Sequence, residues 1–191
     1  MIEPRDGTEP LGDWSHKLNE DDRRSIEKLS IEYAWLIDHG RADEATHLFT
    51  DDAVVQVHGA TLTGTAQIHA ALQQRKAQRH VQSRHVVSNI RLQVESADRV
   101  SGTVALTVYQ SVDAPAEPTP VMVGDLDDVY ARGLDMRWRV ASRRLVPVFI
   151  RSDHRQDASP PVESDYTEMQ ARLSDDPLSP TVDGANGTNG R

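Results

Sequence analysis

The sequence predicts a single α+β domain in which three helices cover one face of a curved, mainly antiparallel sheet. Within the predicted domain, helical periodicity is found before about residue 80, and period-two alternation runs from about 83 to 148. The segments between the alternating runs are shorter than the crossover of a dozen or more residues that parallel neighbours require. Helices followed by long strands are typical of α+β folds, and a twisted sheet wrapped around a helix forms a cone with a pocket at its open end.

Three helices are predicted before the long strands, each from apolar residues that recur at helical spacing. In the first helix this stripe includes Ile26 and Leu29, and Asn19 is placed to cap the N-terminus. The predicted elements of this half are a helix from Asn19 to His39-Gly40, a short helix over 42–49, a strand over 53–57 and a helix from a Thr65 cap to about residue 79.

Four long strands are predicted after the helices, joined by polar turns that make them antiparallel neighbours. They span about 83–94, 99–112, 120–132 and 136–148. Alternation along the first of them places Ser83, His85, Val87 and Asn89 on one face, and Arg84, Val86, Ser88 and Ile90 on the other.

Composition excludes several classes of protein. The chain has 191 residues and no cysteine, which excludes a disulfide framework, a cysteine-ligated zinc site and a thiol nucleophile. No apolar run approaches the ~20 residues that span a bilayer, and the first residues do not resemble a signal peptide. We therefore expect a cytoplasmic protein.

The net charge of −9 lies at the two ends of the chain, because residues 23–149 carry equal numbers of acidic and basic residues. A balanced core lacks the basic surface that nucleic acids or anionic membranes require. The predicted organisation is an N-terminal extension (1–18), one domain (19–149) and a low-complexity, acidic tail (150–191), in which a short helix over 163–173 could form.

The order and spacing of several segments resemble a known family. They are YAWLID (33–38), LFTDDAVV (48–55), LTG (62–64), RHVVSNI (84–90), VGDLDDVYAR (123–132) and RWRVASRRL (137–145). Over 23–149 the chain resembles the SnoaL-like branch of the nuclear transport factor 2 superfamily, which implies the cone fold. Members of this superfamily include dehydratases, isomerases, cyclases, small subunits of dioxygenases and binding modules, so the activity has to be argued from the site.

Asp38 and His85 are the first candidates for that site. Asp38 lies near the C-terminal end of the first helix, where the helix dipole disfavours a carboxylate, so it needs a partner. The resemblance implies that this Asp meets the strand histidine, His85, in the cone. It also implies that Tyr33, five residues before the Asp, faces the same space.

This trio predicts acid-base chemistry. An imidazole has an ordinary pKa of ~6.5, which suits proton transfer near neutrality, and a carboxylate on its far nitrogen fixes the tautomer. His85 would abstract a carbon-bound proton, while Tyr33 would donate a hydrogen bond to the developing oxyanion. The expected function is a cofactor-independent lyase or isomerase, dehydratase-like, that acts on an apolar small molecule with a carbonyl group. No metal motif or phosphate-binding loop is present in the sequence, so no metal or cofactor is expected.

Further residues are candidates for binding the substrate. His58 is the expected second histidine of the pocket, and Tyr109 could supply a second proton donor on a face shared with Thr107 and Ser111. One of Arg143 and Arg144 could face the pocket, and the carboxylates in DLDDVYAR are expected to be structural or solvated. The candidate substrate-binding set is His58, Val55, Val87, Asn89, Tyr109 and Leu126.

Two alternatives to an enzyme stay open, a small-molecule binding module and the small subunit of a dioxygenase. A dioxygenase small subunit would need a large partner subunit. For the protein itself a homo-oligomer is expected, because the outer sheet face is predicted to carry many apolar side chains. The resemblance favours a trimer, with a dimer as the alternative. The residues assigned to that outer face are Val86, Ile90, Val104, Leu106 and Val108.

Overall fold

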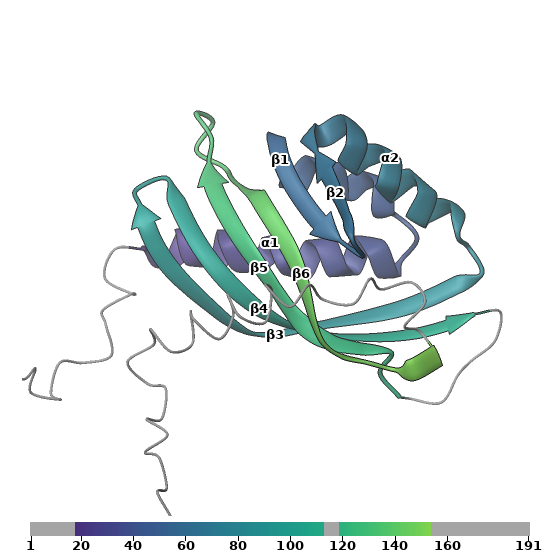
Figure 1. Cartoon of the computed structure of the whole chain (residues 1–191). Coiled ribbons are helices and arrows are strands. Elements are labelled where there is room, and N and C mark those ends of the chain that lie inside the picture. The colour runs from purple at the N-terminus through teal and green to yellow at the C-terminus, as the bar shows by residue number, and fades with distance from the viewer. Residues whose placement is uncertain (1–17, 113–118, 154–191) are drawn as a thin grey trace, which may run out of the picture. The chain divides into compact units, whose positions relative to one another are not determined.

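The structure, a computed structural model, describes residues 18–112 and 119–153. Within these residues, three helices and a curved six-stranded sheet confirm the predicted α+β class (Figure 1). The elements are α1 (Glu20–Asp38), the 3-10 helix η1 (Ala42–Leu48), β1 (Phe49–Val57), β2 (Ala60–Thr63), α2 (Gly64–Ala77), β3 (Val81–Ser96), β4 (Arg99–Val112), β5 (Met122–Arg132) and β6 (Trp138–Ile150).

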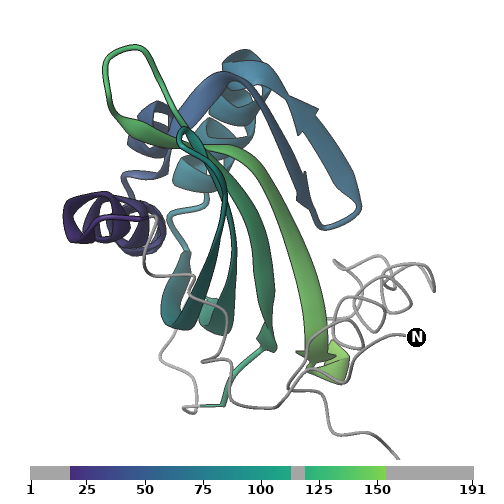
Figure 2. The same ribbon diagram turned by 90° about the vertical axis from the view of Figure 1, so that its left-hand side faces the viewer.

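All six strands form one sheet, in the order β2-β1-β6-β5-β4-β3. Each strand from β3 to β6 pairs antiparallel with the next, as the short connections predicted. Strand β1 lies parallel to β6, and this pairing joins the N-terminal half of the domain to the long strands. Figure 2 shows α1 end on beside the curved strands.

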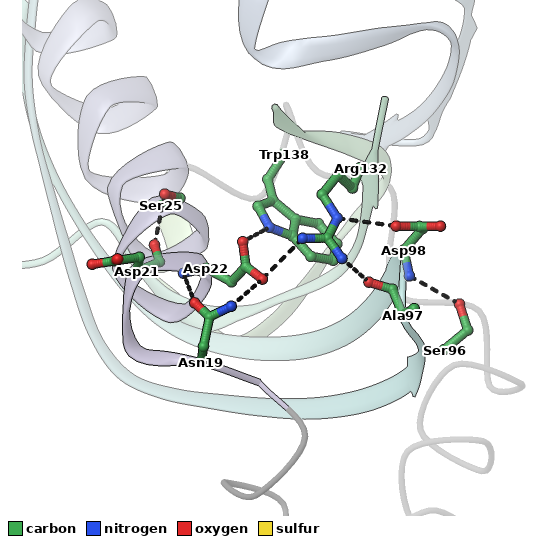
Figure 3. A network of polar contacts seen from close by, with 9 residues as sticks. All are labelled: Asn19, Asp21, Asp22, Ser25, Ser96, Ala97, Asp98, Arg132 and Trp138. Carbon is green, nitrogen blue, oxygen red and sulfur yellow. Dashed lines mark hydrogen bonds and ion pairs between the residues drawn. The ribbon is translucent and has the colours of Figure 1, made fainter. Parts of the chain in front are cut away.

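Helix α1 begins at the predicted cap. The Asn19 side chain accepts a hydrogen bond from the backbone N–H of Asp22 at 2.8 Å. The Asp22 carboxylate in turn accepts from Nε1 of Trp138 at 2.8 Å and from Arg132 at 3.0 Å (Figure 3). Arg132 also donates to Asp98, which follows β3. The first turn of α1 is thereby tied to the β5–β6 and β3–β4 hairpins.

Two predicted boundaries near β1 were wrong. The strand begins at Phe49, which pairs with Val140 of β6, and not at residue 53. Helix α2 begins at Gly64 after the N-cap residue Thr63, so that Thr65 lies inside the helix. The start of α2 was misplaced because strand β2, which the sequence did not indicate, runs directly into this helix. Gly64 has a φ of 75°, a conformation that glycine adopts without strain, and it allows the chain to turn there.

A bulge in β3 changes which of its side chains face inward. Ser88 pairs with Ala105 while Arg91 pairs with Thr103, so two residues of β3 oppose a single residue of β4. Beyond this point Ile90 packs against the core and Asn89 is exposed, with a φ of 48°. The predicted faces of Asn89 and Ile90 were therefore wrong.

The predicted apolar outer face of the sheet was wrong in most of its members. Val104, Leu106 and Val108 are at most 9% exposed and form an inward cluster with Leu126. Of the five residues assigned to the outer face, Ile90 faces the core as well and only Val86, at 50% exposed, has an open side chain. The alternation along β4 shows which residues share a face of the strand. It does not show which of the two faces is covered by the helices.

The predicted end segments lie largely outside the described residues. Residues 1–17 of the expected extension and 154–191 of the expected tail, with its possible helix, are among them. Strand β6 continues to Ile150, one residue past the predicted end of the domain. Among the helices in the described ranges, none combines the length and the apolar character that crossing a membrane requires.

Candidate active site

A cavity of about 570 Å³ lies between the helices and the inward face of the sheet. Aliphatic side chains from both layers make up most of its lining, which suits a small apolar molecule. The apolar lining residues are Ala34, Ile37, Phe49, Val55, Val57, Leu62, Ile68, Ala71, Leu72, Val87, Leu106, Val108, Val121, Met122, Leu126, Leu145 and Ile150. The polar ones are Ser30, Tyr33, His58, Gln74, Arg75, Gln78, Ser83, His85, Gln110 and Arg143.

Asp38 and His85 meet at the wall of this cavity. Nδ1 of His85 lies 2.6 Å from Oδ1 of Asp38, and the backbone N–H of His85 donates to Oδ2 at 2.7 Å. The Ser83 hydroxyl donates to Oδ1 at 2.8 Å. The side chain of Asp38 is 6% exposed and that of His85 is 18% exposed. Both carboxylate oxygens are thus engaged, and the pair is largely shielded from bulk water.

The carboxylate sets the protonation pattern of the imidazole. Because a carboxylate only accepts hydrogen bonds, Nδ1 of His85 carries the hydrogen in this contact, and in the neutral imidazole Nε2 then has the lone pair. Burial alone would raise the pKa of Asp38, but hydrogen bonds from the ring and backbone of His85 and from Ser83 outweigh burial and lower that pKa. Asp38 is therefore charged at neutral pH. It orients an imidazole that lines the cavity, where Nε2 can take a proton from a ligand.

Tyr33 lines the same cavity from α1. Its ring packs edge-on against Phe49, with centroids 6.0 Å apart, and the Arg143 guanidinium lies 4.6 Å from the ring centroid. Burial raises the pKa of the Tyr33 hydroxyl, and the charge of Arg143 opposes this effect only in part. The hydroxyl therefore keeps its proton at neutral pH and can act as a hydrogen-bond donor.

Arg143 brings a buried charge to the cavity wall. It forms a two-pronged ion pair with Asp128, at 2.8 and 2.6 Å, and both side chains are at most 1% exposed. Tyr130 donates to Asp128 at 2.9 Å, and Arg143 donates to Ser30 at 3.4 Å. Nη1 of Arg143 has no hydrogen-bond partner among the described residues. This nitrogen is itself buried, so Arg143 acts on the cavity through its charge and its contact with the Tyr33 ring.

Most of the residues predicted for the site lie around the cavity. Asp38 stands behind His85 and lines a smaller adjoining cavity. The residues from the predicted set that line the main cavity are Tyr33, His85, His58, Val55, Val87 and Leu126.

Two residues predicted to bind substrate, Asn89 and Tyr109, do not line the cavity. The bulge in β3 turns Asn89 to the exposed side. Tyr109 lies between Val108 and Gln110, which both line the cavity, so alternation directs it to the opposite face of β4. Tyr109 is therefore no candidate for the second proton donor.

Three polar residues of the site were missed or left undecided. Arg75 follows Leu72 by three residues on α2, and this spacing could have indicated that it shares the inner stripe. Ser83 was placed on the correct face of β3, but no role was assigned to it. Of the two arginines left open in β6, Arg143 faces the cavity, whereas Arg144 pairs with Asp127 at 2.9 Å.

The described residues offer no cluster that could hold a metal ion. Across 18–112 and 119–153, no three side chains of His, Cys, Asp or Glu come together. His69 bonds to Thr46 at 3.0 Å, and the ring of His39 stacks on Trp35 with centroids 4.3 Å apart.

Comparison with known proteins identifies the family. A family model described as a SnoaL-like domain matches residues 20–144, which is more than half of the chain. The protein belongs to the SnoaL-like family. No curated protein matches the sequence of this SnoaL-like protein.

Solved structures similar to this SnoaL-like protein share its fold. A candidate scytalone dehydratase from Novosphingobium aromaticivorans has a TM-score of 0.63 at 20% identity, over 74% of this chain and 93% of that one. An NTF2-like protein with a cystatin-like fold from the same organism has a TM-score of 0.60 at 22% identity, over 73% and 90% of the two chains. LinA has a TM-score of 0.59 at 18% identity, over 74% and 95%. At these identities the likeness shows the fold alone.

Proposed function

We propose that this protein is a cofactor-independent lyase or isomerase that removes a carbon-bound proton beside a carbonyl group of an apolar small molecule. The observation that carries the proposal is the 2.6 Å contact between His85 Nδ1 and a buried Asp38 carboxylate at the wall of an apolar cavity. A base, a group that orients it and a hydrogen-bond donor are what proton abstraction needs.

The proposed reaction begins at Nε2 of His85. This nitrogen takes the proton from the carbon next to the carbonyl, and the electron pair of the broken C–H bond moves toward the carbonyl oxygen. Tyr33 donates a hydrogen bond to the oxygen as its negative charge grows, and the positive charge of Arg143 beside the Tyr33 ring stabilises that charge. In a dehydration, a C=C bond then forms as the β-hydroxyl leaves and takes the proton from the imidazolium, which releases water. In an isomerisation the imidazolium returns the proton to another carbon.

The contact between His85 and Asp38 also helps to choose between an enzyme and the two non-catalytic alternatives. A dioxygenase small subunit does not need a reachable base, and a binding module needs only the pocket. Here His85 and Asp38 are within hydrogen-bonding distance, and His85 lines the cavity. This geometry supports an enzyme over either alternative.

Proton exchange tests the proposal before the natural substrate is known. The protein is incubated in D2O with a panel of apolar ketones and β-hydroxyketones, and NMR measures loss of the proton next to the carbonyl. We expect His85→Ala to lower the exchange rate by about 10²- to 10⁴-fold, the usual contribution of a positioned base. Asp38→Asn acts in the same direction, because an amide does not hold the imidazole in the required tautomer as a carboxylate does.

The matched control is His80→Ala, since His80 is exposed and does not line the cavity. Its exchange rate should equal that of the unchanged protein. Equal rates for His85→Ala and the unchanged protein would contradict the proposal and favour a binding module.

We further propose that the protein is a homo-oligomer, a trimer on the family resemblance, with a dimer as the alternative. The exposed apolar side chains that support this proposal lie on α1 and at the ends of β4 and β6. Ile31 and Trp35 on α1 are 53% and 43% exposed, and Val112 and Phe149 at strand ends are 53% and 69% exposed. Ile31 and Trp35 are four residues apart and therefore neighbours on one side of α1, and exposed apolar neighbours of this kind often mark a contact between subunits. Light scattering at micromolar concentration tests this, and a stable monomer would contradict it.

A further inference from the structure

A second cavity, of about 370 Å³, adjoins the Asp38 side of the acid-base pair. It lies where the ends of α1 and α2 meet the start of β3. Arg75 lines both cavities and thus belongs to the wall that they share. Most of the side chains around the second cavity are hydrogen-bond donors. They are Arg75, Lys76, Arg79 and Arg84, together with the amides of Gln78 and Gln82.

The charge of this lining is strongly positive. Four cationic side chains face one carboxylate, that of Asp38. Both oxygens of Asp38 already accept hydrogen bonds from His85, and one of them accepts a further bond from Ser83. The donors to the Asp38 carboxylate are thus His85 and Ser83 and none of the four cations. The cavity therefore has more hydrogen-bond donors than acceptors.

Among the described residues, only one of the four cations forms an ion pair with an acidic side chain. Lys76 pairs with Asp43 at 2.8 Å. Arg75 donates to the Ser83 hydroxyl at 2.9 Å, and Arg84 donates to the backbone oxygen of Ser83 at 2.7 Å. A guanidinium has five N–H donors, so these contacts leave part of its capacity for another oxygen.

A favourable interaction with the dipole of α2 explains the position of only some of the four cations. Arg75 and Lys76 are in the last turn of α2, where cations offset the negative end of the helix. Arg84 comes from β3, however, and Arg79 follows the helix end. Cations from separate segments converge on one concave space, which the dipole alone does not require.

We propose that the second cavity binds an oxyanion group, a carboxylate or a phosphate. Both groups offer several acceptor oxygens, and guanidinium groups hold them through paired hydrogen bonds. None of the four cations takes part in the proton transfer proposed for the main cavity.

Binding of inorganic phosphate and of acetate, followed by NMR of the backbone amides at low ionic strength, tests the site. We expect saturable shifts among residues 76–84, which weaken as salt is added. Arg79→Gln and Arg84→Gln should each weaken binding about fivefold, which corresponds to the ~1 kcal/mol between unit charges 4 Å apart in water. The matched control is Arg24→Gln, which removes the same charge from an exposed part of α1.

A second pair of probes identifies the source of the oxyanion. If it belongs to the molecule in the main cavity, a keto acid binds more tightly than the neutral ketone of equal length, and Arg79→Gln removes the difference. If it is a separate ion, phosphate binds equally well with and without the ketone. Either result supports the site.

Shifts that do not saturate, or that are the same in Arg79→Gln and in the Arg24→Gln control, would overturn the proposal. The test measures phosphate binding directly and needs no turnover of a substrate. Failure of the proposed reaction and failure of this site can therefore be told apart.

Discussion

Asp38 is the residue on which the candidate site depends, because it holds the imidazole and is itself held by three hydrogen bonds. Two come from the ring and backbone of His85 and one from Ser83. Ser83 in turn accepts from Arg75 at 2.9 Å. The helix dipole at the end of α1 disfavours a carboxylate, and these donors from β3 compensate for it. The same contacts couple the chemistry of the site to the stability of the fold.

This coupling predicts how stability depends on pH. The pKa of Asp38 is lowered in the folded protein, so its contribution is fully present above the unfolded pKa of about 3.9 and is lost as pH falls through the folded pKa. At pH 7 we expect Asp38→Asn to be less stable by about 1.5–3 kcal/mol, the range for hydrogen bonds to a charged group. Urea unfolding of both proteins from pH 7 down to pH 3 measures the difference.

The difference should shrink at the acid end of that range. Asp51→Asn, at an exposed position, is the control and should show no such trend. A destabilisation by Asp38→Asn that stays constant with pH would mean that the charge of Asp38 does not contribute.

The ion pair of Arg143 and Asp128 leads to a second prediction at this scale. Both side chains are at most 1% exposed, so Asp128→Ala leaves an uncompensated buried charge. We expect a loss of about 3–5 kcal/mol in the free energy of unfolding. Its neighbour Asp127 pairs with Arg144, and both of these side chains are partly exposed. Asp127→Ala should therefore lose no more than about 1 kcal/mol.

Urea denaturation compares these variants under the same conditions. The double variant Asp128→Leu, Arg143→Met removes both charges at once and should recover much of the loss. Equal stabilities for Asp127→Ala and Asp128→Ala would show that burial does not distinguish the two pairs.

Among the elements, β3 shows what the sequence could and could not predict. Alternation placed Ser83, His85 and Val87 on the correct face, and these are the residues of β3 that line the cavity. After the bulge the parity reverses, and Asn89 and Ile90 exchange faces. A bulge depends on how two strands pair, so the pattern of one strand does not reveal it.

Strand β6 limits prediction in the same way. Tyr130 pairs with Val140 while Val129 pairs with Ser142, so the register shifts there too. After the shift Arg143 faces inward and Arg144 faces outward. Two consecutive arginines in a sequence do not indicate which of them faces the cavity. The helix cap at Asn19 and the spacing of Asp38 from Tyr33 were predictable because they depend only on local sequence.

Asn89 offers a test of the bulge itself. Its φ of 48° lies in the left-handed region, which Asn and Gly tolerate and which β-branched residues do not. We expect Asn89→Val to lose about 1–2 kcal/mol of stability and Asn89→Gly to lose little. Thermal or urea unfolding measures both.

Binding of a ketone in the main cavity should be unchanged in Asn89→Gly, because Asn89 is exposed and does not line it. Loss of ketone binding in Asn89→Gly would show that Asn89 contributes to the site, as the sequence predicted. Comparable losses of stability in the Val and Gly variants would mean that the backbone conformation is not the constraint.

For the folded domain as a whole, α1 connects two regions with different tasks. Its first turn carries the network of Asp22, Trp138 and Arg132, which joins two hairpins (Figure 3). Its last residue, Asp38, holds His85 in the cavity. With a rise of 1.5 Å per residue, the two aspartates are separated by about 24 Å along the helix.

This separation predicts that stability and chemistry can be changed independently. Asp22→Ala leaves Nε1 of Trp138 and the guanidinium of Arg132 without their acceptor, and we expect a loss of about 2–3 kcal/mol. For a chain of this length, that loss lowers Tm by about 5–10 °C. The exchange rate of the ketone proton at 25 °C should stay unchanged, since the protein is still folded and the contacts of Asp38 are untouched. Calorimetry and the exchange assay on the same sample measure the two quantities, and a slower exchange by fully folded Asp22→Ala would show that α1 transmits changes from its first turn to the site.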